Sequence, residues 1–447
     1  MSALDHSTIR MELLAEDAPL LEAIMSGGAF GGAYSPHLAQ NMFDPTHQEA
    51  IDDAIRLVEI VEVTDRTWLV RLPIVNAVVV ETDEGLVIID TGMAPGGPAI
   101  LHAIRTVTDA PIHTIIYTHA HVDHCMGTWA LMDDDPQVIA HADAAARFDR
   151  YVRLRGSVSR YMSQPLRSFP AGQDDWVAPT VTFRDSLTIT VGGEQFDLIH
   201  RRGETDDQLY VSIPGQKAIA SADYYQGFLP NAGNGKRVQR YIEEWAEALR
   251  DMVALEPDHL LPAHGEPLSD AAEIAEVLSV HAEALESIVA QTLAGLNERL
   301  RQDEVVEAVR LPDHLADHRV LNVQYVSVKD IAKMVVKQYC GWWDDIPSHW
   351  SDAPFDRQAA MVCELAGGID EVIAKARSLS TSDPTMACHL ADWAYFADPE
   401  SVEAAQAVID VYRDRVLHGS RNTQELLVLL DHMTDARIRI LVAEGGS

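Results

Sequence analysis

The sequence predicts an α/β domain with mixed sheets, followed by an all-helical region. Residues 57–91 contain short runs of Val, Ile, Thr and Leu separated by turn residues, a pattern typical of strands. Beyond that stretch strand-like and helix-like segments alternate, which indicates an α/β architecture. From about residue 270 strand-like runs nearly vanish, and 271–300 repeats apolar residues at helical spacing.

The length of 447 residues exceeds one ordinary core and indicates more than one domain. We expect three parts: an N-terminal arm over 1–50, the α/β domain over 51–272 and the helical domain over 273–447. The arm holds Phe30, Tyr34 and Phe43 among glycines. We expect it to wrap a domain, because these aromatic side chains would otherwise reduce solubility.

The charge balance excludes several functions. The chain has 34 basic and 69 acidic side chains, a formal net charge of -35, and no local basic patch. Such a chain repels nucleic acid and anionic membranes, so neither partner is expected. No stretch approaches the ~20 apolar residues of a membrane span. The N-terminus has no signal-peptide pattern and the four cysteines form no CxxC pair, so we expect a cytoplasmic protein without a disulfide framework.

A cluster of metal-capable side chains follows a predicted buried strand, in the segment THAHVDH. His119 and His121 alternate at the end of that strand, so both can point to one side. Asp123 and His124 lie on the following turn and can aim at a second point nearby. Imidazole nitrogens and a carboxylate are ligands that zinc prefers. The alternative, a surface histidine cluster, is disfavoured because a buried strand leads directly into the group.

Four motifs resemble those of the metallo-β-lactamase superfamily. THAHVDH resembles its HxHxDH motif, and VIIDTG, with Asp90, resembles the aspartate that braces the metal loop. ASADYY, with Asp223, occurs where the family has its bridging carboxylate, and LLPAHG, with His264, resembles the last histidine ligand. The resemblance implies an αββα sandwich catalytic domain over 51–272 that binds two zinc ions per chain.

One motif departs from the common pattern. Most members of the superfamily have GHTxGH before the bridging carboxylate, whereas this chain has RRGETDDQ. Glu204 stands where the histidine would be, and His200 is the competing ligand. A glutamate here resembles the type III alkyl sulfatases, which use acidic ligands at this motif and the next. That branch usually has Glu at the bridging position, so the shorter Asp223 could change the metal spacing slightly.

The C-terminal region resembles the helical dimerisation domain of the same sulfatases. Its most specific segment is GWWDDIP, where Asp345 and Ile346 replace the usual Gly-Asn. The resemblance implies a helical dimerisation-type domain over 273–447 and a homodimer. These sulfatases normally end in a sterol-carrier-like domain and are commonly exported. We expect neither that domain nor export here, which leaves the length of the substrate's alkyl chain open.

The resemblance implies a zinc-dependent hydrolase, most specifically of alkyl sulfate esters, that uses a metal-bridged hydroxide on a small anionic substrate. We assign one zinc to His119, His121 and Glu204, and the other to Asp123, His124 and His264, with Asp223 bridging or completing the pair. Asp123 is also our catalytic residue. Lys236 and Arg237 occur where the family has a sulfate-binding arginine, and Tyr161 resembles a pocket tyrosine.

We weigh three alternative classes of protein, and the first and the third stay open at this point. A lactonase, phosphodiesterase or thioesterase on the same fold could share every ligand. A diiron oxygen reductase would replace the second histidine of the HxHxDH motif by Glu and add a flavodoxin-like domain, and neither feature occurs. A non-catalytic scaffold would keep the metal and bind a partner through its helices.

The predicted substrate residues also have alternative roles. Lys236 and Arg237 could form a solvated basic loop, and Tyr161 could be a packing residue.

Overall fold

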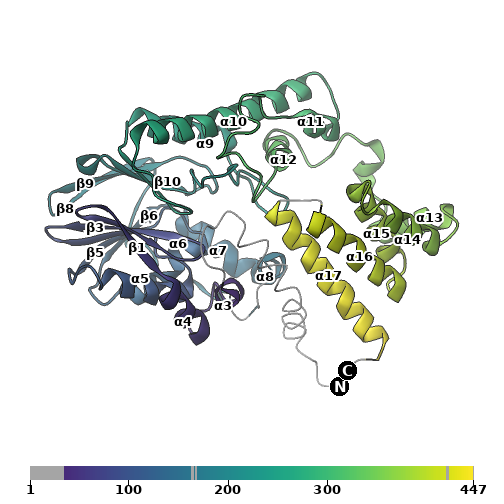
Figure 1. Ribbon diagram of the computed structural model, residues 1–447, viewed down its shortest axis with the longest axis horizontal. Coiled ribbons are helices and arrows are strands. Elements are labelled where there is room, and N and C mark those ends of the chain that lie inside the picture. The colour runs from purple at the N-terminus through teal and green to yellow at the C-terminus, as the bar shows by residue number, and fades with distance from the viewer. Residues whose placement is uncertain (1–34, 163–165, 167–168, 419–421, 446–447) are drawn as a thin grey trace. The chain divides into compact units, whose positions relative to one another are not determined.

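The structure is a computed structural model, and it describes residues 35–162, 166, 169–418 and 422–445 (Figure 1). The chain divides into two compact units, and the boundary between them lies after Cys340. Most of the predicted arm, including Phe30 and Tyr34, lies outside the described residues. Phe43 is only 2% exposed and packs against Tyr151 and Phe169, so this aromatic residue of the arm belongs to a core.

The first unit is built on two β-sheets. The seven-stranded sheet has the order β1-β2-β3-β4-β5-β6-β7, antiparallel as far as β4 and parallel from β4 to β7. Its strands are β1 (Glu59–Thr64), β2 (Thr67–Arg71), β3 (Asn76–Thr82), β4 (Gly85–Ile89), β5 (Ile112–Ile116), β6 (Gln137–His141) and β7 (Val181–Phe183). The parallel half requires helical crossovers, which explains the alternation of strands and helices in the sequence.

The five-stranded sheet has the order β12-β11-β10-β9-β8, and only its β11–β12 pair is parallel. Its strands are β8 (Ser186–Val191), β9 (Glu194–His200), β10 (Leu209–Ile213), β11 (Ala218–Ala222) and β12 (His259–Pro262). The two parallel strands are joined by a connection that contains one long helix. That connection also contains Lys236 and Arg237, two of the predicted substrate-binding residues, between β11 and the helix.

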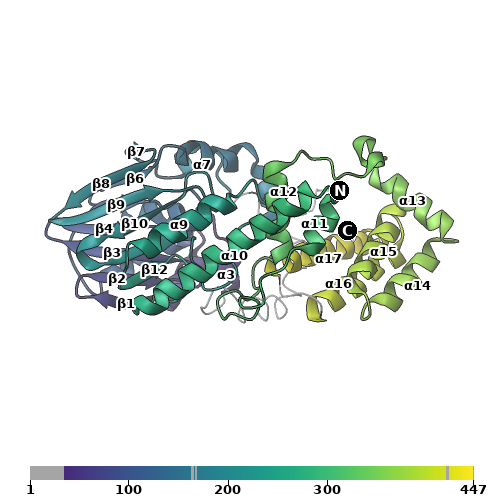
Figure 2. The ribbon, with the colours of Figure 1, turned by 90° about the horizontal axis from the view of Figure 1, so that it is seen from above.

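Helices cover the outer face of each sheet (Figure 1), and Figure 2 shows those over the five-stranded sheet. The seven-stranded sheet is covered by helices that include α4 (Gln48–Leu57), α5 (Gly97–Ile104) and α7 (Ala144–Arg153). The five-stranded sheet is covered by α9 (Ile242–Ala254) and α10 (Ala271–Asn297), and α12 (Val328–Tyr339) packs on α10 in the same apolar core. The remaining helices of this unit are short: α3 (Pro36–Gln40), α6 (Val122–Cys125), α8 (Arg155–Met162) and α11 (Gln302–Ala308). The predicted αββα sandwich is confirmed.

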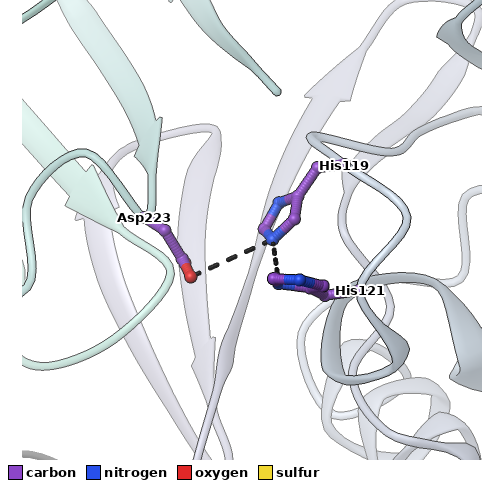
Figure 3. A group of neighbouring side chains, drawn as sticks. All are labelled: His119, His121 and Asp223. Carbon is purple, nitrogen blue, oxygen red and sulfur yellow. Dashed lines mark hydrogen bonds and ion pairs between the residues drawn. The ribbon is translucent and has the colours of Figure 1, made fainter. Parts of the chain in front are cut away.

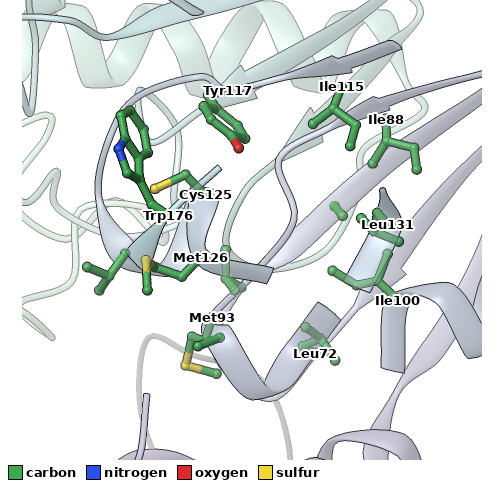
Figure 4. Packing of buried hydrophobic residues seen from close by; sticks show 14 of the residues in the cluster. Leu72, Ile88, Met93, Ile100, Ile115, Tyr117, Cys125, Met126, Leu131 and Trp176 are labelled. Carbon is green, nitrogen blue, oxygen red and sulfur yellow. The ribbon is translucent and has the colours of Figure 1, made fainter. Parts of the chain in front are cut away.

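Strand residues alternate between two apolar layers, as the two-residue period of a strand requires. On β3, Val78 and Val80 face the second sheet, whereas Ala77 and Val79 face the helices. The helix-side layer joins Ile88 of β4, Ile115 of β5 and Ile100 of α5 (Figure 4). Burying one such branched side chain contributes roughly 1.5–3 kcal/mol. The seven-stranded sheet is therefore packed on two faces, with helices on one side and the second sheet on the other.

The second unit is helical throughout the part of 341–447 that the structure describes. Its helices are α13 (Phe355–Leu365), α14 (Ile369–Leu379), α15 (Pro384–Ala397), α16 (Val402–His418) and α17 (Thr423–Ala443). Successive helices pack as hairpins, and the small side chains of Ala376, Ala391 and Ala405 are fully buried where they meet. The predicted helical region is confirmed. None of the described helices is long and apolar enough to cross a membrane.

The predicted domain boundary at residue 273 follows the loss of strands, whereas packing divides the chain later. Helices α10 and α12 share an apolar core with Tyr210 and Leu260 of the second sheet. This packing includes residues up to Cys340 in the first unit. The bounds 51–272 and 273–447 therefore remain a proposal about sequence domains rather than packing units.

Candidate metal centre

The candidate site lies where five strands end. Asp90 directly follows β4, and His119 lies in the loop after β5. Glu204 lies in the loop after β9, Asp223 directly follows β11, and His264 follows β12. Each of these side chains comes from the carboxyl end of its strand. Because β4 and β5 are parallel, as are β11 and β12, their carboxyl ends lie at a common edge, and the loops meet there.

Three of the predicted ligands form a first group: His119, His121 and Asp223 (Figure 3). One ligand atom from each lies within 4.8 Å of the others. His119 Nε2 is 2.9 Å from His121 Nδ1 and 4.0 Å from Asp223 Oδ2. Both imidazoles thus turn a nitrogen toward the same point, as expected from their alternation in THAHVDH.

Asp123, His124 and His264 form a second group with the same spacing of ligand atoms. Asp123 Oδ2 is 3.6 Å from His124 Nε2 and 3.8 Å from His264 Nε2. Asp223 lies between the two groups, because its Oδ1 is 3.5 Å from His124 Nε2 and 3.3 Å from His264 Nε2. The carboxylate that the sequence assigns to a bridging role therefore contacts both groups.

Glu204 lies beside the first group, with Oε1 3.7 Å from His121 Nδ1. The same oxygen pairs with the guanidinium of Arg240 at 2.5 Å, and its Oε2 has no hydrogen-bond partner among the described residues. His200, the competing residue, stacks on His141 with ring centroids 4.0 Å apart, and its Nδ1 lies 2.8 Å from the Gln208 carbonyl oxygen. His200 belongs to neither group, so the geometry favours Glu204.

Asp90 fixes the loop that follows β5 through contacts with Thr118 and His124. Its Oδ1 accepts the Thr118 backbone N–H at 2.8 Å, and its Oδ2 accepts the Thr118 hydroxyl at 2.7 Å and lies 2.8 Å from His124 Nδ1. This contact leaves His124 Nε2 directed at the second group. Asp90 has φ +60°, and Ala222, just before Asp223, has φ +49°. Left-handed backbone costs a non-glycine residue about 1–2 kcal/mol, so the fold maintains strain next to two site carboxylates.

Burial and charge set the pKa values of the imidazoles. Burial lowers the pKa of His119 and of His121 well below the ordinary value, and the neighbouring positive groups add to the effect. A neutral imidazole is the form that binds a metal ion. Burial also opposes protonation of His124 and His264, but the carboxylates around them prevail. Asp223 and Asp123 raise the pKa of His124 well above its usual range and that of His264 to about 9.

The carboxylates respond to the same forces. Burial raises the pKa of Glu204 to about 8, although the Arg240 guanidinium lowers it. Burial also raises the pKa of Asp223, but the imidazoles of His264 and His124 outweigh burial and hold it well below the ordinary value. The centre therefore has strong opposing charges in a space from which water is largely excluded.

The structure describes the side chains of two of the three predicted substrate residues. Lys236 and Arg237 are half-buried in the loop between β11 and α9, and the Lys236 backbone N–H donates to Asn234 Oδ1 at 3.0 Å. Burial lowers the pKa of Arg240, Glu204 opposes this fall, and the charge of Arg237 adds to it. Tyr161 belongs to α8, and its side chain lies outside what the structure describes.

Two residues of the TDDQ segment were not expected to take part. Asp207 Oδ2 accepts the backbone N–H of Ala120, between the two histidines of the first group, at 2.8 Å. Gln208 Oε1 accepts the backbone N–H of Glu204 at 2.6 Å. Both side chains are fully buried. A segment of four residues thus fixes the backbone of two ligand loops, a role for which a single sequence offers no signal beyond its position next to Glu204.

Comparison with known families agrees with this geometry. Residues 70–264 match the metallo-beta-lactamase superfamily, and residues 301–425 match the alkyl sulfatase dimerisation family. The first match covers strands β3 to β12 and every residue of the two ligand groups. The chain therefore combines a metallo-β-lactamase superfamily domain with an alkyl sulfatase dimerisation domain, and the resemblance expected from its motifs is confirmed.

The curated relatives that the chain resembles include alkylsulfatases. The chain is 30% identical over 322 residues to a linear primary-alkylsulfatase of Pseudomonas sp., covering 66% of this chain and 61% of the relative. It is 24% identical over 383 residues to an alkyl/aryl-sulfatase of Saccharomyces cerevisiae, covering 78% and 59%. The chain thus spans about three fifths of the length of these relatives.

The fold has a solved counterpart over nearly the whole chain. The stereoselective inverting sec-alkylsulfatase Pisa1 from Pseudomonas sp. superposes with a TM-score of 0.75, covering 99% of this chain and 78% of that one. The two sequences are 18% identical, so this likeness supports the fold.

Proposed function

We propose that the protein is a zinc-dependent hydrolase of alkyl sulfate esters. The position of Asp223 between two groups of metal-capable side chains is the observation on which the proposal rests. Two adjacent groups that share one carboxylate match the requirements of a two-metal site, where both ions act on the same substrate.

The chemistry of the donors fits zinc. Each group offers imidazole nitrogens and a carboxylate oxygen, which are the ligands that zinc takes in catalytic sites. His124 Nε2, Asp223 Oδ1 and Glu204 Oε2 are buried without a hydrogen-bond partner in the described part of the chain. Buried polar atoms without partners are costly, and two bound cations would together satisfy all three.

We assign one ion to His119, His121 and Glu204, and the other to Asp123, His124 and His264, with Asp223 shared between them. When bound, such a pair supplies a hydroxide near neutral pH and stabilises negative charge on the leaving oxygen. Asp90 and Asp207 hold the ligand loops in place. The Asp123 side chain is 20% exposed, the most open among the paired ligands, and we propose that it orients the attacking water as the catalytic carboxylate.

Three arguments favour a sulfate ester. The named relatives act on alkyl sulfates. Sulfate is a weakly basic leaving group that needs little help from a general acid, and we assign none here. Lys236, Arg237 and Tyr161 are our substrate-binding residues, because a sulfate group pairs well with cationic and hydroxyl donors.

The assembly we propose is a homodimer through the helical region, supported by the match of 301–425 to a dimerisation family. Exposed apolar side chains in this region include Trp342, Trp350 and Leu365, at 75%, 65% and 81%. The cytoplasmic location, and the expectation that neither nucleic acid nor membrane is a partner, stay predictions from composition and from the N-terminal sequence.

Metal analysis beside a substrate panel tests the function. Purified protein dialysed in zinc should retain about two ions per chain and cleave medium-chain alkyl sulfates in preference to matched phosphoesters, lactones and thioesters. Cleavage of one of the other esters instead would place the chain with a different hydrolase on the same fold. Bound metal without turnover on any member of the panel would favour the scaffold alternative.

A further inference from the structure

Arg147 approaches the candidate centre from helix α7. Its side chain is 9% exposed, and its Nη2 lies 3.5 Å from Nε2 of His121. On the other side, Nη1 donates to Asp206 Oδ1 at 3.3 Å, and the Asp206 side chain is 47% exposed. These are the polar contacts of Arg147 in the part of the chain that the structure describes. A guanidinium has five N–H donors, so these contacts use a small part of its capacity.

The two nitrogens of His121 face different surroundings. Nδ1 points into the first group, 2.9 Å from His119 Nε2 and 3.7 Å from Glu204 Oε1. Nε2 points at Arg147. If Nδ1 binds the metal ion, as its position requires, the neutral ring must have its proton on Nε2. Two N–H donors then face each other across 3.5 Å, and no hydrogen bond can join them.

This arrangement departs from the usual surroundings of a metal-binding histidine. Such a histidine normally donates its second N–H to a carboxylate, a carbonyl or a water. At His121 a cation takes that place instead. An acceptor that lies about 2.8–3.0 Å from both nitrogens would satisfy both donors, because two donors this close can share one oxygen. An anionic oxygen fits best, since one donor is charged and the other is polarised by the metal.

We propose that Arg147 and the Nε2–H of His121 together bind an anionic oxygen of the substrate, a tetrahedral oxyanion of the sulfate ester class. The inference rests on the proposed function for the choice of sulfate. The place is accessible, because the His121 side chain is 14% exposed whereas those of His119 and His124 are fully buried. The ion pair with Asp206 is partly exposed, and such a pair is weak enough to exchange for the substrate.

The negative charge of the chain and of the centre explains why a cation such as Arg147 is needed beside the site. The chain has a formal net charge of -35, and the carboxylates of Asp123, Glu204 and Asp223 line the centre. An anionic substrate must approach against this field. Arg240 is committed to Glu204 and to the Asn231 carbonyl oxygen, both inside the protein. Arg147 instead reaches His121 of the first group, with Nη2 3.5 Å from Nε2 of that ring.

Binding of inorganic sulfate to the zinc-loaded full-length protein tests this inference by calorimetry, with bound zinc measured on every sample. Arg147→Gln should keep the zinc content of the wild type and raise the Kd for sulfate at least about ten-fold, the loss expected for a charge-assisted hydrogen bond. Arg147→Lys, which keeps the charge without the planar donors, should bind sulfate with intermediate affinity. Arg153→Ala is the matched control, because Arg153 ends the same helix with a side chain 78% exposed.

The outcomes separate this inference from the proposed function. Wild-type sulfate affinity in Arg147→Gln, or no sulfate binding by the wild type, overturns the role of Arg147 whatever esters the enzyme cleaves. Loss of zinc from both Arg147 variants also overturns it, because Arg147 would then only support His121. If the wild type cleaves no alkyl sulfate and Arg147→Gln still loses sulfate affinity, the function fails and the oxyanion site stands.

Discussion

Arg240 and Glu204 form an ion pair inside the protein, with Nη2 of the arginine 2.5 Å from Oε1 of the glutamate and side chains 2% and 5% exposed. Removing one partner of a buried pair leaves an uncompensated charge, which typically costs 3–5 kcal/mol. Burial raises the pKa of Glu204 to about 8, so the test belongs at about pH 9 or above, where Arg240→Gln should lower the free energy of unfolding of the metal-free protein by about 3–5 kcal/mol. Urea denaturation after chelation measures this loss.

Two companion variants make that experiment specific. Arg240→Gln combined with Glu204→Gln should be less destabilised than Arg240→Gln alone, because Glu204 then no longer leaves an unpaired buried charge. Arg250→Gln breaks an exposed pair with Glu286, whose side chains are 43% and 47% exposed, and should cost less than about 1 kcal/mol. Equal losses of unfolding free energy for Arg240→Gln and Arg250→Gln would show that breaking the buried pair costs no more than breaking an exposed one.

The choice between Glu204 and His200 can be decided by metal content. Glu204→Ala should reduce bound zinc from about two ions per chain to about one, because a catalytic zinc needs three protein ligands. His200→Ala should keep both ions, since His200 stacks on His141 outside the two groups. Elemental analysis of both variants measures the difference. The opposite pattern would mean that the ligand assignment in this loop is shifted.

Glu204→His should keep the metal and change substrate preference, because the site loses a negative charge.

Asp90 should control the affinity of the second group for its metal. Asp90→Asn keeps the size of the side chain and tolerates the φ of +60°, but it loses the charge that orients His124. Loss of such a supporting contact typically costs 10–100-fold in metal affinity, and we expect a loss of about this size. Zinc competition with a chromogenic chelator measures it. Asp83→Asn, which removes a carboxylate 78% exposed, is the control and should change nothing. Unchanged affinity in Asp90→Asn would remove Asp90 from the support of the site.

Gly127 should be essential to the contact between two site loops. A Cβ at this position would lie 1.9 Å from the Thr91 carbonyl oxygen and 3.0 Å from Gly97 Cα. Gly127→Ala should therefore separate the loop after β4 from the metal loop, with a loss of about 1–3 kcal/mol in stability. Gly156→Ala is the control, because its Cβ would meet nothing within 4 Å and alanine favours the helix by up to about 1 kcal/mol. Thermal unfolding of both variants checks the difference, and a stable Gly127→Ala protein would contradict the contact.

Most of the site could be predicted because its ligands occur in short motifs at strand ends. THAHVDH, Asp223 and His264 follow apolar runs that the sequence makes plain, and the structure brings them together in two groups. The fold class followed from the same pattern of alternating strands and helices. The domain boundary was harder to predict, because α10 and α12 look like part of a helical domain in the sequence but share an apolar core with the five-stranded sheet.

The residues that support the ligands could not be predicted for a physical reason. Arg147, Asp207 and Arg240 act through contacts between segments far apart in the chain, such as the pair of Arg240 with Glu204. Arg240 lies three positions after Arg237 in a segment that resembles a solvated basic loop, yet it is 1% exposed. Only the start of helix α9 two residues later indicates that this arginine could turn inward.

The homodimer prediction depends on the exposed aromatic residues of the helical unit. The rings of Trp342 and Trp350 lie 5.5 Å apart and are 75% and 65% exposed. Large exposed apolar side chains commonly mark interfaces, and a buried Trp often contributes 2 kcal/mol or more to binding, about thirty-fold in Kd. Light scattering should give about twice the chain mass of 49.3 kDa, and Trp342→Ala should shift the protein toward the monomer on dilution. Val107→Ala, which trims a side chain 40% exposed in the α/β unit, should keep the dimer. A monomer in the wild type would refute the dimer, whereas a Trp342→Ala protein that dimerises as tightly as the wild type would place the interface on another face of the helices.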